Sequence, residues 1–177
     1  MEAPDEELML AYGRGDAGAF ETLYRRHRGA LYRFVLRSIR QRGAAEELFQ
    51  EVWIRVIEAR SRYAPQGRFT TWLYTIAHNM LVDHWRKKGL TLVQLDDEPS
   101  VAAPDNPARQ AEARQSLARL MHALEALPAA QREAFLLHEE AGLSVAEIAA
   151  VTGAGEEAAK SRLRYAMTKL KAAVEDE

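Results

Sequence analysis

The chain has 177 residues, of which 47% are hydrophobic and 28% charged, with a net charge of −2 and no cysteine. Length and composition fit one medium domain or two small ones, and the lack of cysteine excludes disulfides, Cys-ligated metal centres and thiol catalysis. The first ten residues are acidic where a signal peptide is basic, and no apolar run has membrane-spanning length. We therefore expect a cytoplasmic protein without membrane insertion.

The small net charge hides a segregation of charge along the chain. Residues 1–95 carry fifteen Lys/Arg against eleven Asp/Glu, residues 96–108 carry four acids and no cation, and residues 160–171 carry five cations and no acid. Electrostatic contact depends on local charge more than on the total. The balance therefore does not exclude a nucleic-acid binder.

Helical periodicity dominates the first half of the chain, and no alternating strand pattern persists. A short helix with an acidic start is expected near residues 5–12, and Asp16 is placed to cap a longer helix. Two further helices are expected over residues 44–60 and, after a turn at 64–67, over residues 71–88. The apolar and aromatic positions of the second helix are Phe20, Leu23, Tyr24, His27, Leu31, Phe34 and Val35.

The third expected helix has two distinct faces. Its core stripe consists of Ala45, Leu48, Phe49, Val52, Trp53 and Val56. The opposite face carries Glu46, Glu47, Gln50, Glu51 and Glu58, with Ile54 among them. An exposed Ile surrounded by carboxylates favours docking onto a basic partner through an apolar centre. An ordinary solvated face, on which one exposed Ile is normal, is the alternative.

The stretch TWLYTIAHNMLVDHWRKK at residues 71–88 contains two histidines and an aspartate, which raises the question of a metal site. His78 and His84 are six residues apart, so they point about 120° from each other around a helix. Asp83 lies about 100° from His84. Because these side chains cannot converge on one point, we predict no metal and no other cofactor.

The same stretch divides into a buried arc and a polar face. The buried arc consists of Trp72, Leu73, Ile76, Ala77 and Met80. The polar face consists of Thr71, Thr75, His78, Asn79, Val82 and Arg86, with Tyr74 and Trp85 at its edge. Aromatic rings beside cations suit unpaired bases and their backbone. An ordinary solvated helix surface remains the alternative.

Residues 96–108, DDEPSVAAPDNPA, have the composition of a linker, with three prolines and four acids. Two helices are expected beyond it, over residues 108–127 and 130–140, and Gly142 ends the second. Ser144 then begins a short helix with Glu147 as its capping-box partner, and residues 152–155 form a tight turn before a basic helix. Helix, glycine-containing turn and helix together predict a helix-turn-helix.

The final helix is expected to present a basic face to DNA. Its buried arc is predicted to consist of Ala159, Leu163, Ala166, Met167, Leu170 and Val174. The opposite side carries Lys160, Ser161, Arg162, Arg164, Tyr165, Lys169 and Lys171. Presented by a helix-turn-helix, such a face can enter the major groove, where Arg or Lys pairs with guanine. A solvated basic face is the alternative.

Five segments in register resemble a bacterial RNA polymerase sigma factor of the extracytoplasmic-function group of the sigma-70 family. They are GDAGAFETLYRRH, AEELFQEVWIRV, RFTTWLYTIAHNMLVDHWRKK, LPAAQREAFLLHEEAGLSVAEIA and AAKSRLRYAMTKL. The resemblance covers nearly the whole chain. It implies a transcription initiation factor that is not an enzyme and that binds core RNA polymerase and promoter DNA, with an anti-sigma factor as a possible further partner.

The resemblance also implies a role for each surface. Polymerase binding is expected at Glu47, Gln50, Glu51 and Ile54. Recognition of the −10 element is expected at Gly67, Arg68, Phe69, Thr70, Asn79 and Arg86. Recognition of the −35 element is expected at Lys160, Ser161, Arg162, Arg164 and Tyr165. The acidic linker would thread toward the polymerase active site, where its carboxylates could mimic RNA phosphates.

We therefore predict an all-α protein of two small helical domains joined by a flexible acidic linker, with a helix-turn-helix in the C-terminal domain. The expected ranges are 1–95 for the N-terminal domain, 96–108 for the linker and 109–177 for the C-terminal domain. A stand-alone helix-turn-helix regulator is the first alternative, and it would prefer a two-fold DNA site. A metal-dependent nucleic-acid hydrolase is the second.

Overall fold

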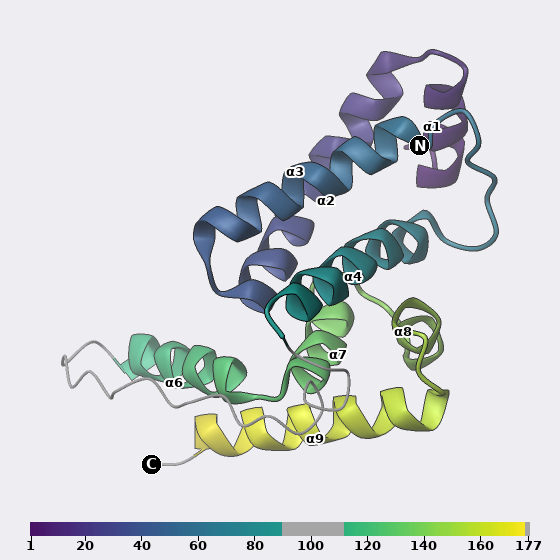
Figure 1. Ribbon diagram of the computed structural model, residues 1–177. Coiled ribbons are helices and arrows are strands. Elements are labelled where there is room, and N and C mark those ends of the chain that lie inside the picture. Colours follow the sequence, from purple (N-terminus) through teal and green to yellow (C-terminus); the bar gives the residue numbers. More distant parts are fainter. Residues whose placement is uncertain (90–111, 176–177) are drawn as a thin grey trace.

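The computed structural model describes residues 1–89 and 112–175, and every regular element in these ranges is an α-helix (Figure 1). The helices are α1 (Asp5–Gly13), α2 (Ala17–Ile39), α3 (Arg42–Glu58), α4 (Phe69–Lys87), α6 (Glu112–Ala126), α7 (Ala129–Glu139), α8 (Val145–Thr152) and α9 (Glu156–Glu175). The first four form an N-terminal domain and the last four a C-terminal domain, which confirms the predicted fold class. The acidic linker predicted at 96–108 lies outside the described residues.

Local sequence signals fix several helix ends. The Asp16 carboxylate accepts the N–H of Ala19 at 3.2 Å, so it caps α2 as predicted. At α8 the Ser144 hydroxyl accepts the N–H of Glu147 and the Glu147 carboxylate accepts the N–H of Ser144, both at 3.2 Å. The predicted capping box is therefore present. Gly153 ends α8 with a φ of 71°, a left-handed conformation that favours glycine.

Aromatic side chains dominate the core of the N-terminal domain. Phe34 is fully buried and meets Tyr74 edge to face at 5.2 Å between ring centroids. Trp53 packs against both Phe20 and Tyr24, at 5.9 and 5.1 Å. Each such side chain contributes about 1.5–3 kcal/mol through burial, and the ring pairs add about 0.5–1.5 kcal/mol. This core holds α4 against α2 and α3.

The C-terminal core is aliphatic and is built around α9. Ala159, Ala166 and Leu170 are buried there, as predicted, and Leu163 packs against the core. The prediction was wrong for Met167 and Val174, which are 45% and 40% exposed. Helical spacing gives the centre of a buried stripe, but the neighbouring helices set its width.

The two domains lie against each other, and α4 is between the other N-terminal helices and α7 and α8 (Figure 1). Helix α4 packs against α8, while α2 packs against α7. Tyr74 and Trp85 were expected at the edge of an open polar face, and this was wrong, because they are 1% and 6% exposed. Within residues 1–89 and 112–175, no helix combines the length and the apolar character needed to cross a membrane.

Candidate nucleic-acid interface

A pocket of about 430 Å³ opens beside the first turn of α4. The connection from α3 to α4 and the start of α4 supply its walls: Ala59, Arg62, Tyr63, Ala64, Gln66, Gly67, Arg68, Thr71, Trp72 and Thr75. Gly67 has a φ of 121°, which glycine adopts without strain, so the connection can fold back at this point. Two aromatic rings, guanidinium groups and an amide thus surround a space large enough for a planar heterocycle.

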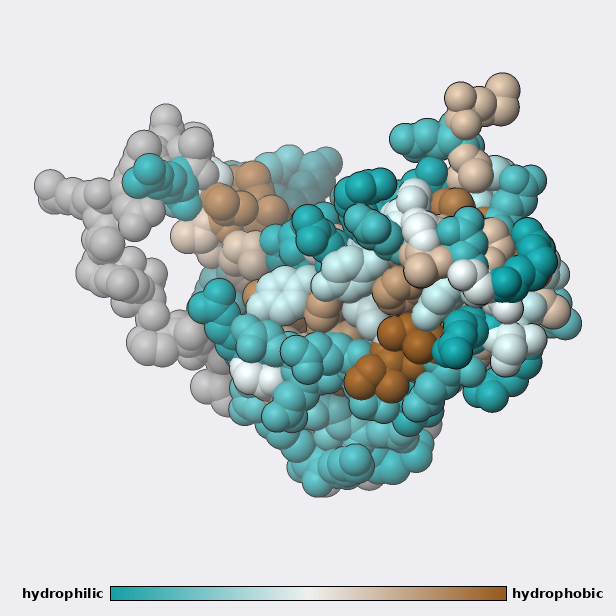
Figure 2. Space-filling view, turned by 90° about the horizontal axis from the view of Figure 1, so that it is seen from above, coloured by the Kyte–Doolittle hydropathy of each residue, from teal (hydrophilic) through white to brown (hydrophobic). Residues whose placement is uncertain are grey.

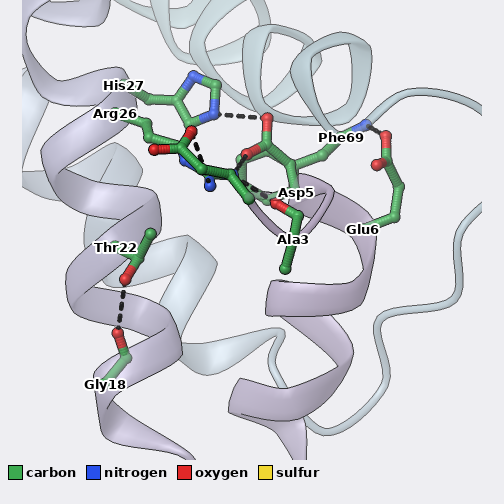
Figure 3. Close-up of polar contacts among 9 residues, drawn as sticks. Ala3, Asp5, Glu6, Gly18, Thr22, Arg26, His27 and Phe69 are labelled. Carbon is green, nitrogen blue, oxygen red and sulfur yellow. Dashed lines mark hydrogen bonds and ion pairs between the residues drawn. The ribbon is translucent and has the colours of Figure 1, made fainter.

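A carboxylate from α1 contacts the first residue of α4, next to the pocket loop (Figure 3). The Glu6 side chain accepts the backbone N–H of Phe69 at 2.7 Å, at the first residue of α4. Arg68, the residue before the helix, makes no side-chain cap of its own. Glu6 therefore satisfies a donor that the helix leaves unpaired, and its charge complements the positive end of the helix dipole.

The neighbouring Asp5 ties α1 to α2. Its carboxylate accepts from Arg26 at 2.9 Å and lies 2.8 Å from the His27 ring nitrogen (Figure 3). Burial alone would raise the pKa of Asp5, but the hydrogen bonds and charges of His27 and Arg26 lower it below its ordinary value. The His27 ring in turn lies 5.4 Å from the ring of Phe69. The position of α4 thus depends on Glu6 directly and on Asp5 through His27.

Tyr63 lines the pocket and also lies close to the carboxylates of Glu6 and Asp5. Its ring packs edge to face on Trp72 at 4.9 Å. Burial, followed by the charges of Glu6 and Asp5, raises the pKa of Tyr63 to about 12, so the phenol stays protonated. Among the described residues its buried hydroxyl has no hydrogen-bond partner. Tyr63 therefore contributes the side of its ring, and not its hydroxyl, to the pocket wall.

The six residues predicted to recognise the −10 element occupy different environments. Gly67 and Arg68 are exposed in the pocket loop, whereas Phe69 and Thr70 are 0% and 9% exposed and support the loop from inside. Asn79 is exposed further along α4. Arg86 is exposed near the end of that helix, 3.8 Å from Asp83. The structure therefore places four of the six at the surface.

Part of the polar face of α4 is covered by the C-terminal domain. Arg68 contacts both carboxylate oxygens of Glu147, at 3.1 and 3.2 Å, and the Thr71 hydroxyl donates to the same carboxylate at 3.0 Å. His78 is 9% exposed, and its ring nitrogen contacts the carboxylate of Glu133, which is 4% exposed. The open face expected from the sequence is thus an interdomain contact at these positions.

The residues predicted to recognise the −35 element lie on the outer side of α9. Lys160, Arg164 and Tyr165 are exposed, and Ser161 and Arg162 are half-buried. The Arg164 guanidinium lies 5.4 Å from the centroid of the Tyr165 ring. Such stacking restrains a long cation while its donors stay available. The arrangement is suited to contacts with phosphate and base edges.

The predicted docking face of α3 is exposed as expected from its periodicity. Glu47 and Gln50 are exposed, and Ile54 is 44% exposed. Glu51 is half-buried and lies 3.6 Å from Arg55. Figure 2 looks down on the N-terminal helices and shows a mainly hydrophilic surface with small hydrophobic patches. An isolated apolar side chain among carboxylates fits the centre of a protein–protein contact.

Sequence reasoning missed several pocket residues. Arg62, Tyr63 and Gln66 precede α4 in a stretch that reads only as a turn, and Trp72 was assigned to the buried arc. Trp72 packs on the core and also lines the pocket, so both assignments hold in part. The available signal was the spacing of Tyr63 and Trp72 on either side of Gly67, which brings two rings to one loop.

Two family models match the chain, one to each domain. Residues 23–91 match Sigma-70 region 2, and residues 117–170 match Sigma-70, region 4. The first match contains α3, α4 and the pocket, and the second contains α7, α8 and most of α9. Both matched ranges therefore coincide with the surfaces described above.

Curated relatives and solved structures agree with this assignment. The RNA polymerase sigma factor CarQ of Myxococcus xanthus is 36% identical over 92% of this chain and 93% of its own length. The ECF RNA polymerase sigma factor SigC of Mycobacterium tuberculosis is 30% identical over 98% of this chain and 95% of its own. CnrH, solved in complex with the cytosolic domain of CnrY, is 27% identical with a TM-score of 0.68, covering 95% of both chains.

Proposed function

Because the chain belongs to the extracytoplasmic-function group of RNA polymerase sigma factors, and so is a promoter-directing transcription initiation factor, we propose a role for each of its surfaces. The α3 face formed by Glu47, Gln50, Glu51 and Ile54 binds core RNA polymerase. The pocket and polar face of α4 capture unpaired −10 bases. The basic face of α9 reads the −35 duplex.

The pocket at α4 is the observation that carries this proposal. Its Tyr63 and Trp72 rings can stack on an extruded base, and Arg62 and Arg68 can bind the adjacent phosphates. Stacking of this kind contributes about 1–3 kcal/mol per base, comparable with the few kcal/mol needed to unstack one. Capture in the pocket therefore offsets much of the cost of opening the duplex.

The roles proposed for the six −10 residues follow from how exposed each side chain is. Arg68, Asn79 and Arg86 supply polar contacts to the strand, and Gly67 shapes the loop. Phe69 and Thr70, which are buried, act by holding the loop in place. On α9, Lys160 and Arg164 grip phosphates, while Arg162, with Ser161 and Tyr165 beside it, reads base edges.

We also propose a domain organisation, a cellular location and a further partner. The N-terminal domain spans residues 1–95 and the C-terminal domain 109–177, joined by the linker at 96–108. The protein works in the cytoplasm as a binding factor without catalysis, metal or other cofactor. A protein inhibitor of the anti-sigma class is a further proposed partner, since the similar CnrH was solved with the cytosolic domain of CnrY. The stand-alone regulator is not favoured, because it leaves the Sigma-70 region 2 match unused.

Binding to bacterial core RNA polymerase, measured by fluorescence anisotropy, tests the docking role. We expect tight wild-type binding and a loss of about ten-fold or more for Glu51→Lys and for Ile54→Ala, because a central apolar anchor and its charged rim carry most of such an interface. Glu21→Lys makes the same charge change on an exposed residue of α2 and is the matched control. Equal binding by all four proteins would exclude the α3 face.

A further inference from the structure

Three exposed arginines lie at the end of the N-terminal domain where α1 ends and the connection from α3 to α4 begins. Arg14 follows α1 directly, and Arg60 and Arg62 belong to the turn after α3. Arg62 also lines the pocket. Helix α1 and this connection run side by side, on the side of α4 away from α7, α8 and α9 (Figure 1). The three residues form an arginine row that begins at the pocket and leads away from the C-terminal domain.

A close backbone contact between α1 and this turn holds the arginine row together. A Cβ atom at Gly13 would lie 2.5 Å from the Arg60 carbonyl oxygen, nearer than real Cβ atoms come, so glycine permits this approach. Arg14 is the next residue, and its backbone therefore lies beside that of Arg60. The Arg60 guanidinium lies 5.8 Å from the centroid of the Tyr12 ring and donates to the Ile57 carbonyl at 2.8 Å. These contacts restrain Arg60 and leave its other N–H groups available.

The positive charge of the arginine row is not neutralised by the residues around it. Other arginines of the domain have acid partners, as Arg26 has in Asp5 at 2.9 Å and Arg55 has in Glu51 at 3.6 Å. Within residues 1–89 and 112–175, no carboxylate forms an ion pair with a guanidinium of the row. The acid nearest in sequence, Asp16, uses its carboxylate to cap α2. The row is therefore complementary to an anionic partner.

The position of the row beside the pocket indicates which anion it fits. A strand whose base enters the pocket has phosphates on both sides of that base. On one side, Arg68 and Arg86 lie along α4, where they are proposed to contact the strand. On the other side, the strand leaves the pocket past Arg62 and reaches Arg60 and then Arg14. A row of guanidinium groups that continues a base pocket matches the way proteins follow a single strand.

We propose that the arginine row binds backbone phosphates of the unpaired strand, on the side of the captured base that leads away from α4. This inference rests on the proposed capture of a −10 base in the pocket. The row contributes affinity without reading sequence, because every nucleotide presents the same phosphate to a guanidinium. The single-strand surface thus continues past the pocket and onto the end of α1, which the −10 residues do not include.

Oligonucleotide length gives a selective test of the row in the assembled polymerase holoenzyme. One unpaired oligonucleotide carries the −10 element alone, and two others extend it by several nucleotides at the 5′ or at the 3′ end. The row variant combines Arg14→Ala, Arg60→Ala and Arg62→Ala. We expect it to bind one of the two extended oligonucleotides about ten-fold more weakly than the wild type. For that oligonucleotide the slope of log affinity against log salt should fall by about 2, since each phosphate contact to a single strand contributes about 0.7.

Two further variants separate charge at the row from charge elsewhere and from structure. The matched control removes three other exposed arginines of the domain, with Arg25→Ala, Arg28→Ala and Arg42→Ala, and should bind all three oligonucleotides as the wild type does. A second row variant carries Lys at all three positions of the row. It should keep most of the affinity for the extended oligonucleotide, because an ammonium also binds phosphate, whereas a purely structural role of the guanidinium groups would not be restored.

The outcomes distinguish the row from the proposed function. Arg68→Ala should weaken binding of the short −10 oligonucleotide, and unchanged binding would contradict capture at the pocket. If Arg68→Ala does weaken it but the alanine row variant binds both extended oligonucleotides like the wild type, the row is refuted while the proposed function stands. A row variant that loses affinity for core polymerase instead would show that the row contacts protein, which also overturns the proposal. Circular dichroism of each variant confirms that the N-terminal domain remains folded.

Discussion

The two surfaces proposed to contact promoter DNA differ in what covers them. At the start of α4, Arg68 and Thr71 are engaged by a glutamate of the other domain, whereas on α9 Lys160 and Arg164 are exposed. A single-stranded target appears only after the duplex opens, but a duplex target is present from the start. Both surfaces thus reach solvent, but only the single-strand surface shares some of its polar side chains with the other domain of the chain.

The largest loss of stability is expected from Glu133→Ala, which removes a contact between the two domains. Removing the carboxylate leaves the buried His78 without its partner and should cost about 3 kcal/mol in the free energy of unfolding. Urea denaturation followed by circular dichroism measures the loss. Glu139→Ala, on the exposed side of α7, should stay within about 0.5 kcal/mol of wild type. Similar losses in both variants would mean that the pair does not stabilise the interface.

On α9, Arg162→Ala should weaken holoenzyme binding to the cognate −35 duplex by about 2 kcal/mol. Binding to a scrambled duplex should weaken by far less. The reason is that a bidentate contact to a base edge is lost only where that base is present. Competition binding with the two duplexes measures the difference. Lys171→Ala, near the end of α9, is the control. Equal losses on both duplexes would assign Arg162 to a phosphate.

A smaller effect is expected at the first residue of α4, next to the pocket loop. Glu6→Ala removes the acceptor for the Phe69 N–H and should cost about 1 kcal/mol of stability, together with part of the −10 binding. Glu6→Gln keeps an acceptor oxygen and should restore most of both. Glu7→Ala, the exposed neighbour on α1, should change neither. If Gln and Ala behave alike in unfolding and oligonucleotide binding, the hydrogen bond does not position α4.

The smallest effect is expected from acid acting on the ion pair of Glu147 and Arg68. Because this pair is partly exposed, its loss should lower the free energy of unfolding by less than about 1 kcal/mol. Burial alone would raise the pKa of Glu147, but hydrogen bonds from Ser144 and Thr71 and the Arg68 charge lower it below its ordinary value. Its contribution is therefore complete above the ordinary pKa of 4.5 and is lost as pH falls through the lowered folded-state value. Urea denaturation of the wild type and of Glu147→Gln across this pH range, followed by circular dichroism, measures the loss.

Asp5 provides the control for that measurement. Its pKa is also lowered, so the N-terminal domain loses some stability under acid independently of the interface. Asp5→Asn removes this contribution and should leave the pH response that is due to Glu147 in place. Glu147→Gln should flatten it. A response that disappears in Asp5→Asn instead would show that acid acts within the N-terminal domain and not on the contact between Glu147 and Arg68.

Much of the fold could be predicted from the sequence because its signals are local. The Asp16 cap and the box of Ser144 and Glu147 involve residues three positions apart, and both are present. Helix bounds differ from expectation by a few residues, as at α4, which begins at Phe69 instead of Thr71. On α3 one face packs against the core and the other faces solvent, so the spacing of apolar residues identified both faces correctly.

The candidate site was less predictable because its contacts join distant segments. Nothing near His78 in the sequence indicates Glu133, 55 residues away, or shows that this histidine is buried. Tyr74 and Trp85 were misplaced because helical spacing does not show how far the core extends around α4, where Tyr74 packs on Phe34 of α2. A polar helix face has one signature in the sequence, whether water, DNA or another domain of the chain lies against it.

The contacts at the C-terminal end of α2 have a consequence for how the molecule opens. There the Arg132 guanidinium, 6% exposed, donates to the Ser38 carbonyl at 3.4 Å, and Arg40 donates to the Glu125 carbonyl at 3.1 Å. These acceptors are peptide carbonyls, which do not titrate, so the bonds depend on the two arginine side chains alone. Loss of the Glu147 charge loosens the α4–α8 end and leaves these bonds intact. We therefore expect the domains to part as a hinge pivoting on the end of α2, with the widest displacement at the pocket.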